Sequence, residues 1–477
     1  MTHYKQYVRF DKKILIVGFG SIGQAILPLI LRHMDIKPGQ IHIITGDARG
    51  QAEAKELGIG FEINPLTREN YLSVLEKHLS KGDFLLNLSV DVSCEALIEW
   101  CQSHGVMYED TVIEPWSGEG GYMDTKLSLS ERSNYAARES MLKLRGRLPK
   151  NGPTAVITHG ANPGLVSHFL KQALLNIAKD TGASDKLPTN KKEWSELAAK
   201  LNVKVIHIAE RDTQVADDPK PHGVFENTWS IDGFYSEGVA QPAELGWGSH
   251  EKHFPADGAR HTFGCGSAIY LKRPGASTRV RTWTPMEGSF YGFCVTHGET
   301  ISISDYYTVK DASGKVTYRP TVHYAYHPCD GAVSSLHELA GKNWAPPAQQ
   351  RLIVDEITSG VDELGVLLCG HAKGAYWYGS QLGIEETREL IPYNNATSLQ
   401  VAVCAFAGMI WAIENPNAGI VEPDEMDHAR VLEICTPYLG PVVGKYTDWT
   451  PLKDRELLFA EDLDKSDPWQ FKNIRVI

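Results

Sequence analysis

Acidic and aromatic side chains recur in the middle of the chain beside small or turn-forming residues, and these residue types can hold a cation. Glu210, Glu237 and Asp362 are the acids, and Trp229 supplies an indole ring. Carboxylates bind ammonium groups, and the face of a tryptophan adds a cation–π attraction of roughly 0.5 to 2 kcal/mol. Taken singly, an acid beside glycine more often makes a turn or a cap, and a tryptophan more often belongs to the core. Their sum favours a pocket for a cationic amine.

Three further residues complete the predicted reaction site. A proline and a tryptophan follow Glu114 and hold it in place, although a solvated loop acid is the alternative. His297 ends an apolar run and can shuttle protons near neutral pH, although a lone histidine at a strand end is more often a satisfied core residue. Asn162 lies in a turn-rich loop and can orient an amine or a cofactor carboxamide. The spacing of His323 and His327 suits a metal, but the alternating tyrosines between them favour a strand, so no metal site is predicted.

A glycine-rich loop near the N-terminus predicts a dinucleotide site. An apolar run at 14–17 breaks into Gly-x-Gly-x-x-Gly and then into a helical pattern. Gly18 permits the tight turn, Gly20 lets the backbone approach a pyrophosphate, and Gly23 allows close packing of helix on strand. With Ser21 and Ile22, these glycines form the predicted phosphate-binding loop, in which the helix N-terminus faces the anion.

The elements that position these residues alternate between short apolar strands and amphipathic helices over the first 150 or so residues, which is typical of a parallel sheet with crossover helices. Ligands of such sheets bind beyond the carboxyl ends of the strands. The alternative for Asp91 is that it caps the next helix. Beyond the glycine loop, the positions predicted to contact the cofactor at these strand ends are Asn87, Leu88, Ser89, Asp91, Thr111, Asn162 and Pro163.

The acid expected to select between NAD and NADP lies a few residues further along the chain than is usual. An acid about 20 residues past the glycine loop usually accepts the adenosine ribose hydroxyls and favours NAD. Here the second strand runs into Asp47, and Arg49 nearby can tolerate a phosphate. We therefore predict NAD.

Composition excludes several classes of protein. The chain has 477 residues and a formal net charge of -12, which argues against a nucleic-acid partner. The longest apolar run, at 401–413, is short of the roughly 18 residues that span a bilayer, so we expect a buried helix and no membrane association. The eight scattered cysteines and the absence of an apolar signal region at the N-terminus predict a cytoplasmic protein.

The predicted fold class is α/β, with a Rossmann-type doubly wound parallel sheet and an inserted mixed α+β domain. We expect a dinucleotide-binding domain at 1–160 with a returning helix near 395–420, a substrate domain at 161–394, and a C-terminal tail at 421–477. The alternation of strands and helices stops over the middle segment, where a mixed, largely antiparallel sheet is expected. Residues 436–477 are expected to form ordered loops with little regular structure.

The loops together resemble those of the bacterial homospermidine synthases, in the wider saccharopine dehydrogenase-like group. The resemblance runs from about residue 13 to 471. It is carried by the loops at 18–23, 87–91, 114–116, 160–164, 207–214, 227–230, 241–248, 323–329 and 467–471.

This resemblance implies a reaction without net redox, in a homodimer whose middle domain also serves dimerisation. NAD takes a hydride from the amine-bearing carbon of putrescine, a second putrescine condenses with loss of ammonia, and the hydride returns to give homospermidine. Glu210 and Asp362 are then candidates for holding ammonium ends or relaying protons. Glu114 and Glu237 are assigned to the inner site, and the face of Trp229 to the cationic intermediate.

Two other functions stay open on the sequence alone. A dehydrogenase of a saccharopine-like amino acid adduct would need cationic residues for substrate carboxylates, whereas these clusters carry more acids than lysines or arginines. A non-catalytic NAD-binding regulator would bind the dinucleotide without turning over an amine.

Overall fold

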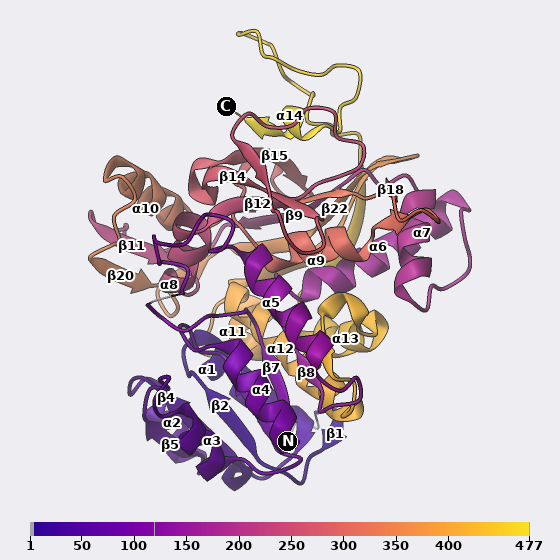
Figure 1. The fold of residues 1–477 in the computed structure, drawn as a ribbon. Helices are drawn as coiled ribbons and strands as arrows, with labels where there is room; N and C mark the ends of the chain where they lie inside the picture. The colour runs from indigo at the N-terminus through magenta and orange to yellow at the C-terminus, as the bar shows by residue number, and fades with distance from the viewer. Residues whose placement is uncertain (1–3, 119, 477) are drawn as a thin grey trace.

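The computed structural model describes residues 4–118 and 120–476, which form two large β-sheets with helices between them and four small two-stranded sheets (Figure 1). In this part of the chain the first sheet has seven strands, all parallel, in the order β24-β8-β7-β6-β2-β4-β5. The strands are β2 (Ile14–Val17), β4 (Ile41–Thr45), β5 (Gly60–Ile63), β6 (Phe84–Asn87), β7 (Met107–Asp110), β8 (Ala155–Val156) and β24 (Ile420–Val421). Strands β2 and β6 are buried along their whole length, as expected where helices cover both faces of a sheet. The predicted Rossmann-type parallel sheet is confirmed.

The crossover helices follow the strands as the sequence predicts. They are α1 (Ser21–His33), α2 (Gln51–Glu56), α3 (Tyr71–His78), α4 (Cys94–His104) and α5 (Asn134–Arg147). Alternate residues of one strand serve the two faces: Ile14 and Ile16 pack with α1, whereas Leu15 and Val17 pack with α3 and α4. Because the strands are all parallel, each crossover begins at the same edge of the sheet, where the strands end.

The second sheet is mixed and largely antiparallel, as predicted. Its main path among the described residues is β13-β14-β12-β19-β9-β22-β23-β25, and β9 and β19 run parallel to each other. The strands are β9 (Val205–Asp212), β12 (Pro242–Gly246), β13 (Gly258–Arg260), β14 (Ala268–Pro274), β15 (Arg279–Thr284), β16 (Gly288–Phe293), β19 (Thr321–His327), β22 (Val361–His371), β23 (Gly374–Gly383), β25 (Val442–Thr447) and β26 (Arg475–Val476). In the central register Tyr326 lies opposite Glu210, and Asp362 lies opposite Asp212. Acidic and aromatic residues of three adjacent strands are thereby neighbours.

Two long helices, α6 (Leu165–Thr181) and α12 (Ala396–Glu414), lie between the sheets (Figure 1). Helix α12 packs on α1 and also contacts β7, β22 and β23, so one apolar core spans both sheets. Helix α12 is long and apolar enough to span a membrane, with a mean hydropathy of 1.7 over 18 residues. However, 89% of these residues are buried inside the fold. Its apolar sides are therefore covered by protein, in line with the core helix expected at 401–413.

The remaining elements are short. The helices are α7 (Lys191–Lys200), α8 (Ile231–Tyr235), α9 (Gly298–Tyr306), α10 (Asp330–Gly341), α11 (Ile384–Leu390), α13 (His428–Cys435) and α14 (Phe471–Ile474). The outlying strands are β1 (Val8–Arg9), β3 (Met34–Asp35), β10 (Val215–Ala216), β11 (Val224–Asn227), β17 (Val309–Lys310), β18 (Val316–Tyr318), β20 (Gln349–Leu352) and β21 (Ile357–Ser359).

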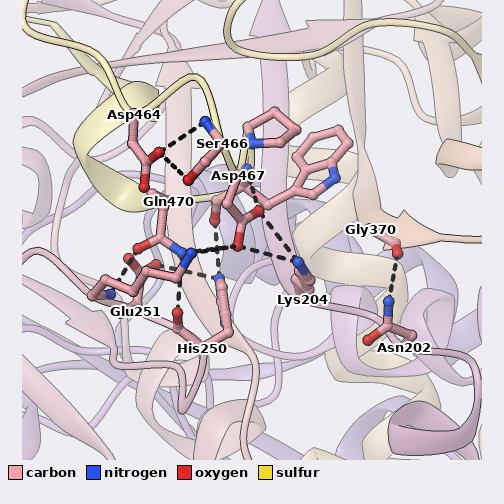
Figure 2. Close-up of polar contacts among 12 residues, drawn as sticks. Asn202, Lys204, His250, Glu251, Gly370, Asp464, Ser466, Asp467 and Gln470 are labelled. Atoms are coloured by element: carbon pink, nitrogen blue, oxygen red, sulfur yellow. Dashed lines mark hydrogen bonds and ion pairs between the residues drawn. The ribbon is translucent and has the colours of Figure 1, made fainter.

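The C-terminal segment has more regular structure than the ordered loops expected from the sequence. Strand β25 pairs with β23, and β26 pairs with β15, so both extend the second sheet. Polar contacts also hold the segment against this sheet (Figure 2). Lys204 Nζ lies 3.2 Å from the Asp467 carboxylate, and Gln470 donates to Asp467 and to the carbonyl of His250. The strands were not expected because their stability comes from pairing with distant strands rather than from local pattern.

Candidate active site

A cavity of about 790 Å³ lies at the carboxyl ends of β2, β4 and β6, where the glycine loop is. Gly18 has φ +87°, and a Cβ there would lie 2.7 Å from the carbonyl carbon of Leu88. A Cβ on Gly20 would meet no protein atom within 4 Å, so the backbone there faces open space. This bare backbone at the start of α1 fits the pyrophosphate of a dinucleotide. The predicted cofactor residues that line the cavity are Gly18, Gly20, Ser21, Ile22, Gly23, Asp47, Leu88, Ser89 and Asp91.

Asp47 is held at the end of β4 by Arg49. The guanidinium Nε and Nη2 donate to the same carboxylate oxygen at 2.9 and 2.7 Å. These hydrogen bonds are the main reason that the pKa of Asp47 lies below its usual value. A fixed carboxylate is thus available for ribose hydroxyls in spite of the late position of Asp47 in the sequence.

Four residues predicted to contact the cofactor do not line this cavity. Asn87 is buried and accepts a hydrogen bond from Ser89 Oγ at 2.5 Å, so it shapes the turn beside the cavity. Thr111 lies against Gly160. Asn162 instead contacts Glu210, and Pro163 lines a small cavity with Glu237 and His297.

Several cavity residues were not assigned from the sequence. Arg68 and Asn64 come from the loops after β5, and Ser230, Asp232 and Gln350 come from the far side of the cleft. No local motif marks these positions, because their place depends on how the second part of the chain packs over the first. The strand-end rule alone would have pointed to Asn64, which directly follows β5.

Glu210 is the centre of the first carboxylate cluster. It is 3% exposed near the end of β9, where Asn162 Nδ2 donates to its Oε2 at 2.7 Å and the Tyr324 hydroxyl donates to the same oxygen. Burial raises the pKa of Glu210 to about 7, although the two hydrogen bonds oppose the shift. The group therefore changes charge close to neutrality.

Asp362 and Asp212 lie beside Glu210 on the same face of the sheet. Thr397 Oγ1 donates to Asp362 at 2.5 Å, and Thr228 Oγ1 donates to Asp212 at 2.8 Å. Burial, followed by the charges of Glu210 and Asp212, holds the pKa of Asp362 well above its usual value. Three buried carboxylates on adjacent strands are costly to ionise together unless a cation joins them. Asp212 was not predicted as a site residue, although the alternation Glu-x-Asp along β9 is a usable signal.

A second cluster surrounds His297. Its Nε2 lies 3.1 Å from Glu237, and its Nδ1 lies 3.2 Å from Glu299. Burial by itself would lower the pKa of His297, but the two carboxylates more than offset it and hold the pKa well above the usual value. The two acids therefore favour the protonated imidazolium, whereas the sequence alone suggests a histidine that exchanges its proton near neutral pH.

Glu114 is buried and lines a second cavity, of about 300 Å³, together with Glu95 and Glu131. Burial raises the pKa of Glu114 to about 8, and the charges of Asp91 and Glu237 add to the shift. Asp91 also lines the dinucleotide cavity, and Glu237 belongs to the cluster at His297, so the charge of Glu114 is coupled to both sites.

Aromatic rings join the two clusters. Trp229 Nε1 donates to the Tyr326 hydroxyl at 2.9 Å, and the rings of Tyr326 and Tyr324 stack with centroids 5.0 Å apart. Tyr324 in turn lies 4.3 Å from the ring of His297. The tyrosines were missed, because their alternation was used only to predict a strand. All seven predicted reaction residues form one connected set: Glu114, Asn162, Glu210, Trp229, Glu237, His297 and Asp362.

This arrangement can bind an ammonium group and take a proton from it next to a dinucleotide. Carboxylates with raised pKa values accept protons near neutral pH, and the indole face and the acids favour a cation. The imidazolium of His297 is already paired with two acids, so it is not free to bind a substrate carboxylate.

The chain is similar to proteins of known family along its whole length. Residues 14–156 match the family model of the saccharopine dehydrogenase NADP binding domain, and residues 160–447 match that of the saccharopine dehydrogenase C-terminal domain. The homospermidine synthase of Blastochloris viridis is 54% identical over 100% of both chains, and that of Mesorhizobium japonicum is 52% identical over 98% of this chain and 97% of its own.

Solved structures of similar proteins agree with these sequence matches. The homospermidine synthase of Legionella pneumophila in complex with NAD has a TM-score of 0.92 and 50% identity, with 98% of each chain covered. The saccharopine dehydrogenase (L-Glu forming) of Saccharomyces cerevisiae has a TM-score of 0.53 at 10% identity and covers 91% of this chain and 100% of its own, so it shares the fold.

Proposed function

The chain belongs to the homospermidine synthase family, and from this premise we propose that it joins two molecules of putrescine into sym-homospermidine with release of ammonia. The observation that carries the proposal is the set of buried carboxylates with raised pKa values beside the dinucleotide cavity. Such a set binds diammonium compounds and takes up protons from them. Two diamines less one ammonia give the triamine, so the cycle has no net redox change.

In the proposed cycle one hydride leaves the substrate and is later returned to it. NAD, when bound, accepts a hydride from the amine-bearing carbon of putrescine and later returns it. The reacting nitrogen must first lose its ammonium proton, because a protonated amine does not release a hydride easily. The resulting imine carbon is attacked by the amine of a second putrescine, ammonia leaves, and the returning hydride reduces the new carbon–nitrogen double bond.

We assign the proton transfers to Glu114 and Glu237. The pKa of Glu114, about 8, suits a group that exchanges protons with an amine near neutral pH. Glu237 lies 3.1 Å from His297, which fixes the position of that carboxylate beside Glu114. His297 is thus a charged partner of Glu237 in this proposal.

We assign the binding of the distal ammonium group to Glu210 and Asp362, with Trp229 offering its ring face to the cation. Asn162 donates to Glu210 and so fixes the orientation of that carboxylate. Tyr326 anchors the indole N–H of Trp229, which fixes the plane of the ring. These roles rest on contacts in the structure and on the chemistry of diamines.

The test mixes the purified protein with NAD and putrescine that carries deuterium on both amine-bearing carbons. We expect homospermidine that retains every deuterium, with a flat NADH absorbance, because the hydride returns from the same bound cofactor. Accumulation of NADH without a coupled polyamine would make the protein an ordinary amine dehydrogenase. No product and no NADH would reject the proposed substrate.

Binding of putrescine should release protons. At pH 7 Glu114 is mainly protonated and Glu210 is about half protonated, since their pKa values are about 8 and about 7. A bound ammonium lowers both pKa values, so we expect release of on the order of one proton per diamine. Calorimetry in buffers of different ionisation enthalpy measures this on protein loaded with NADH, which cannot accept a hydride. Glu114→Gln should reduce the release, and the same heat in all buffers would contradict the expectation.

We also propose that the protein is a homodimer in the cytoplasm, and that 161–394 is the substrate and dimerisation domain. The homodimer is supported by the resemblance to the family, and a cytoplasmic location by the sequence composition. Light scattering of the purified chain measures the mass. A monomer at working concentration would overturn the dimer. The alternative of a saccharopine-like dehydrogenase is not favoured, because the site is rich in acids and the high-identity relatives are homospermidine synthases.

A further inference from the structure

A small lobe stands over the dinucleotide cavity from the side of the second sheet. It consists of the parallel pair β11 and β20 with helices α8 and α10, and we call it the rim lobe (residues 224–240 and 330–352) (Figure 1). In the register of the pair Phe225 lies opposite Gln350, and Asn227 lies opposite Leu352. The rim lobe is thus built from two segments that are remote from each other in the chain.

Residues of the rim lobe form the far wall of the cofactor cavity. They are Ser230, Ile231, Asp232, Gln350 and Leu352. Gln350 Nε2 donates to Asp232 Oδ1 at 2.6 Å, which ties the helix to the strand at the exposed edge of the cavity. Neither residue is needed for the core, because both side chains are exposed.

An electrostatic link crosses the cleft from this wall to the first sheet. The pKa of Arg49 is raised by its hydrogen bonds to Asp47, against the opposing effect of burial, and the charge of Asp232 raises it further. Asp232 therefore lies near the Arg49–Asp47 pair at the end of β4. Both Asp232 and Arg49 line the cavity, from opposite sides.

The same lobe carries two residues of the proposed reaction site. Trp229 directly precedes Ser230, whose side chain caps α8 by accepting from the backbone N–H of Gly233 at 3.1 Å. Glu237 lies in the π-helical turn Ser236–Ala240 that continues α8. Asn395 fixes the base of the lobe by donating to the carbonyl of Thr228 at 2.6 Å.

We propose that the rim lobe is a latch for the cofactor, in which Asp232 and Gln350 close the open side of the cavity and slow the release of the bound dinucleotide. The purpose of the latch rests on the proposed hydride cycle, because NADH that leaves between the two hydride transfers cannot return its hydride to the same substrate. Trp229 and Glu237 lie in the same lobe, so the latch is continuous with the proposed substrate site.

The test measures release of NADH, without any amine. Protein loaded with NADH is mixed with excess NAD, and the loss of NADH fluorescence gives the dissociation rate. We expect Asp232→Ala and Gln350→Ala each to raise this rate by about tenfold, because mutations at an interface act mainly on dissociation. The thermal midpoint of each variant, measured without cofactor, checks that the exposed substitutions leave the fold intact.

Gln349→Ala is the matched control. Gln349 is the neighbour of Gln350 on β20, is exposed, and does not line the cavity, so its variant should release NADH at the unmodified rate. Unmodified rates in both Asp232→Ala and Gln350→Ala would overturn the latch, and so would an equal acceleration in Gln349→Ala. Because no amine is present, failure of the latch would leave the putrescine reaction to be judged by its own experiment.

Discussion

Replacing Glu237 with glutamine is expected to lower the turnover of putrescine by about two to four orders of magnitude, the usual range for loss of a general acid or base. Glutamine keeps the size of the side chain but cannot accept a proton. It also removes one of the two carboxylates beside His297, at 3.1 Å, and one of the charges that raise the pKa of Glu114. Mass spectrometry of homospermidine measures the rate.

The same variant should bind NAD as the unmodified protein does, because Glu237 does not line the dinucleotide cavity. Fluorescence titration with NADH checks this. Glu385→Gln, on the exposed first turn of α11, is the matched control and should leave turnover unchanged. If Glu237→Gln also leaves turnover unchanged, Glu237 has no part in the reaction.

Replacing Gly20 with alanine is expected to weaken NAD binding by on the order of 100-fold, about 2.7 kcal/mol, without weakening the fold. The φ of Gly20 is -77°, which alanine adopts, and the added methyl group would meet no protein atom within 4 Å. It would instead occupy the space where the backbone approaches the phosphates. The thermal midpoint of the cofactor-free protein should therefore stay the same.

Gly18→Ala should behave differently. Its φ of +87° strains any residue with a Cβ, and that Cβ would lie 2.7 Å from the backbone of Leu88. We expect the free energy of unfolding to fall by about 1 to 3 kcal/mol, together with loss of NAD binding. Denaturant unfolding and NADH titration of both variants measure the two effects. Full NAD affinity in Gly20→Ala would contradict the assignment of the cavity to the dinucleotide.

The parallel half of the fold could be predicted closely because its signals are local. An apolar run, a glycine loop and an amphipathic helix in sequence specify a strand, a turn and a crossover, and β2 and α1 are found where they were expected. Helix α12 could be predicted as a buried helix too, since a helix apolar on most sides must be covered by protein. The strands of the C-terminal segment were missed, because β25 and β26 depend on pairing with partners far away in the sequence.

The candidate site was predicted as a set of residue types rather than as an arrangement. The acids at 210, 237 and 362 and the indole at 229 could be named because carboxylates and aromatics are the groups that bind amines. Their partners, Tyr324 and Tyr326, were missed because a tyrosine in a strand is more often part of the core. Only the register of β19 against β9 brings Tyr326 opposite Glu210.

By itself, the sequence determined the dinucleotide fold, the glycine loop, the family and the acidic chemistry of the site, because each depends on residue types at short, fixed spacing. The tertiary structure alone decided the electrostatics of the site and which residues form the wall opposite the glycine loop. Burial raises the pKa values of Glu114 and Glu210, and two acids hold the proton on His297, because desolvation and Coulomb interactions depend on distances between residues remote in the chain. For the same reason the rim lobe over the cofactor cavity could not be predicted, since its wall combines residues near 231 with residues near 350.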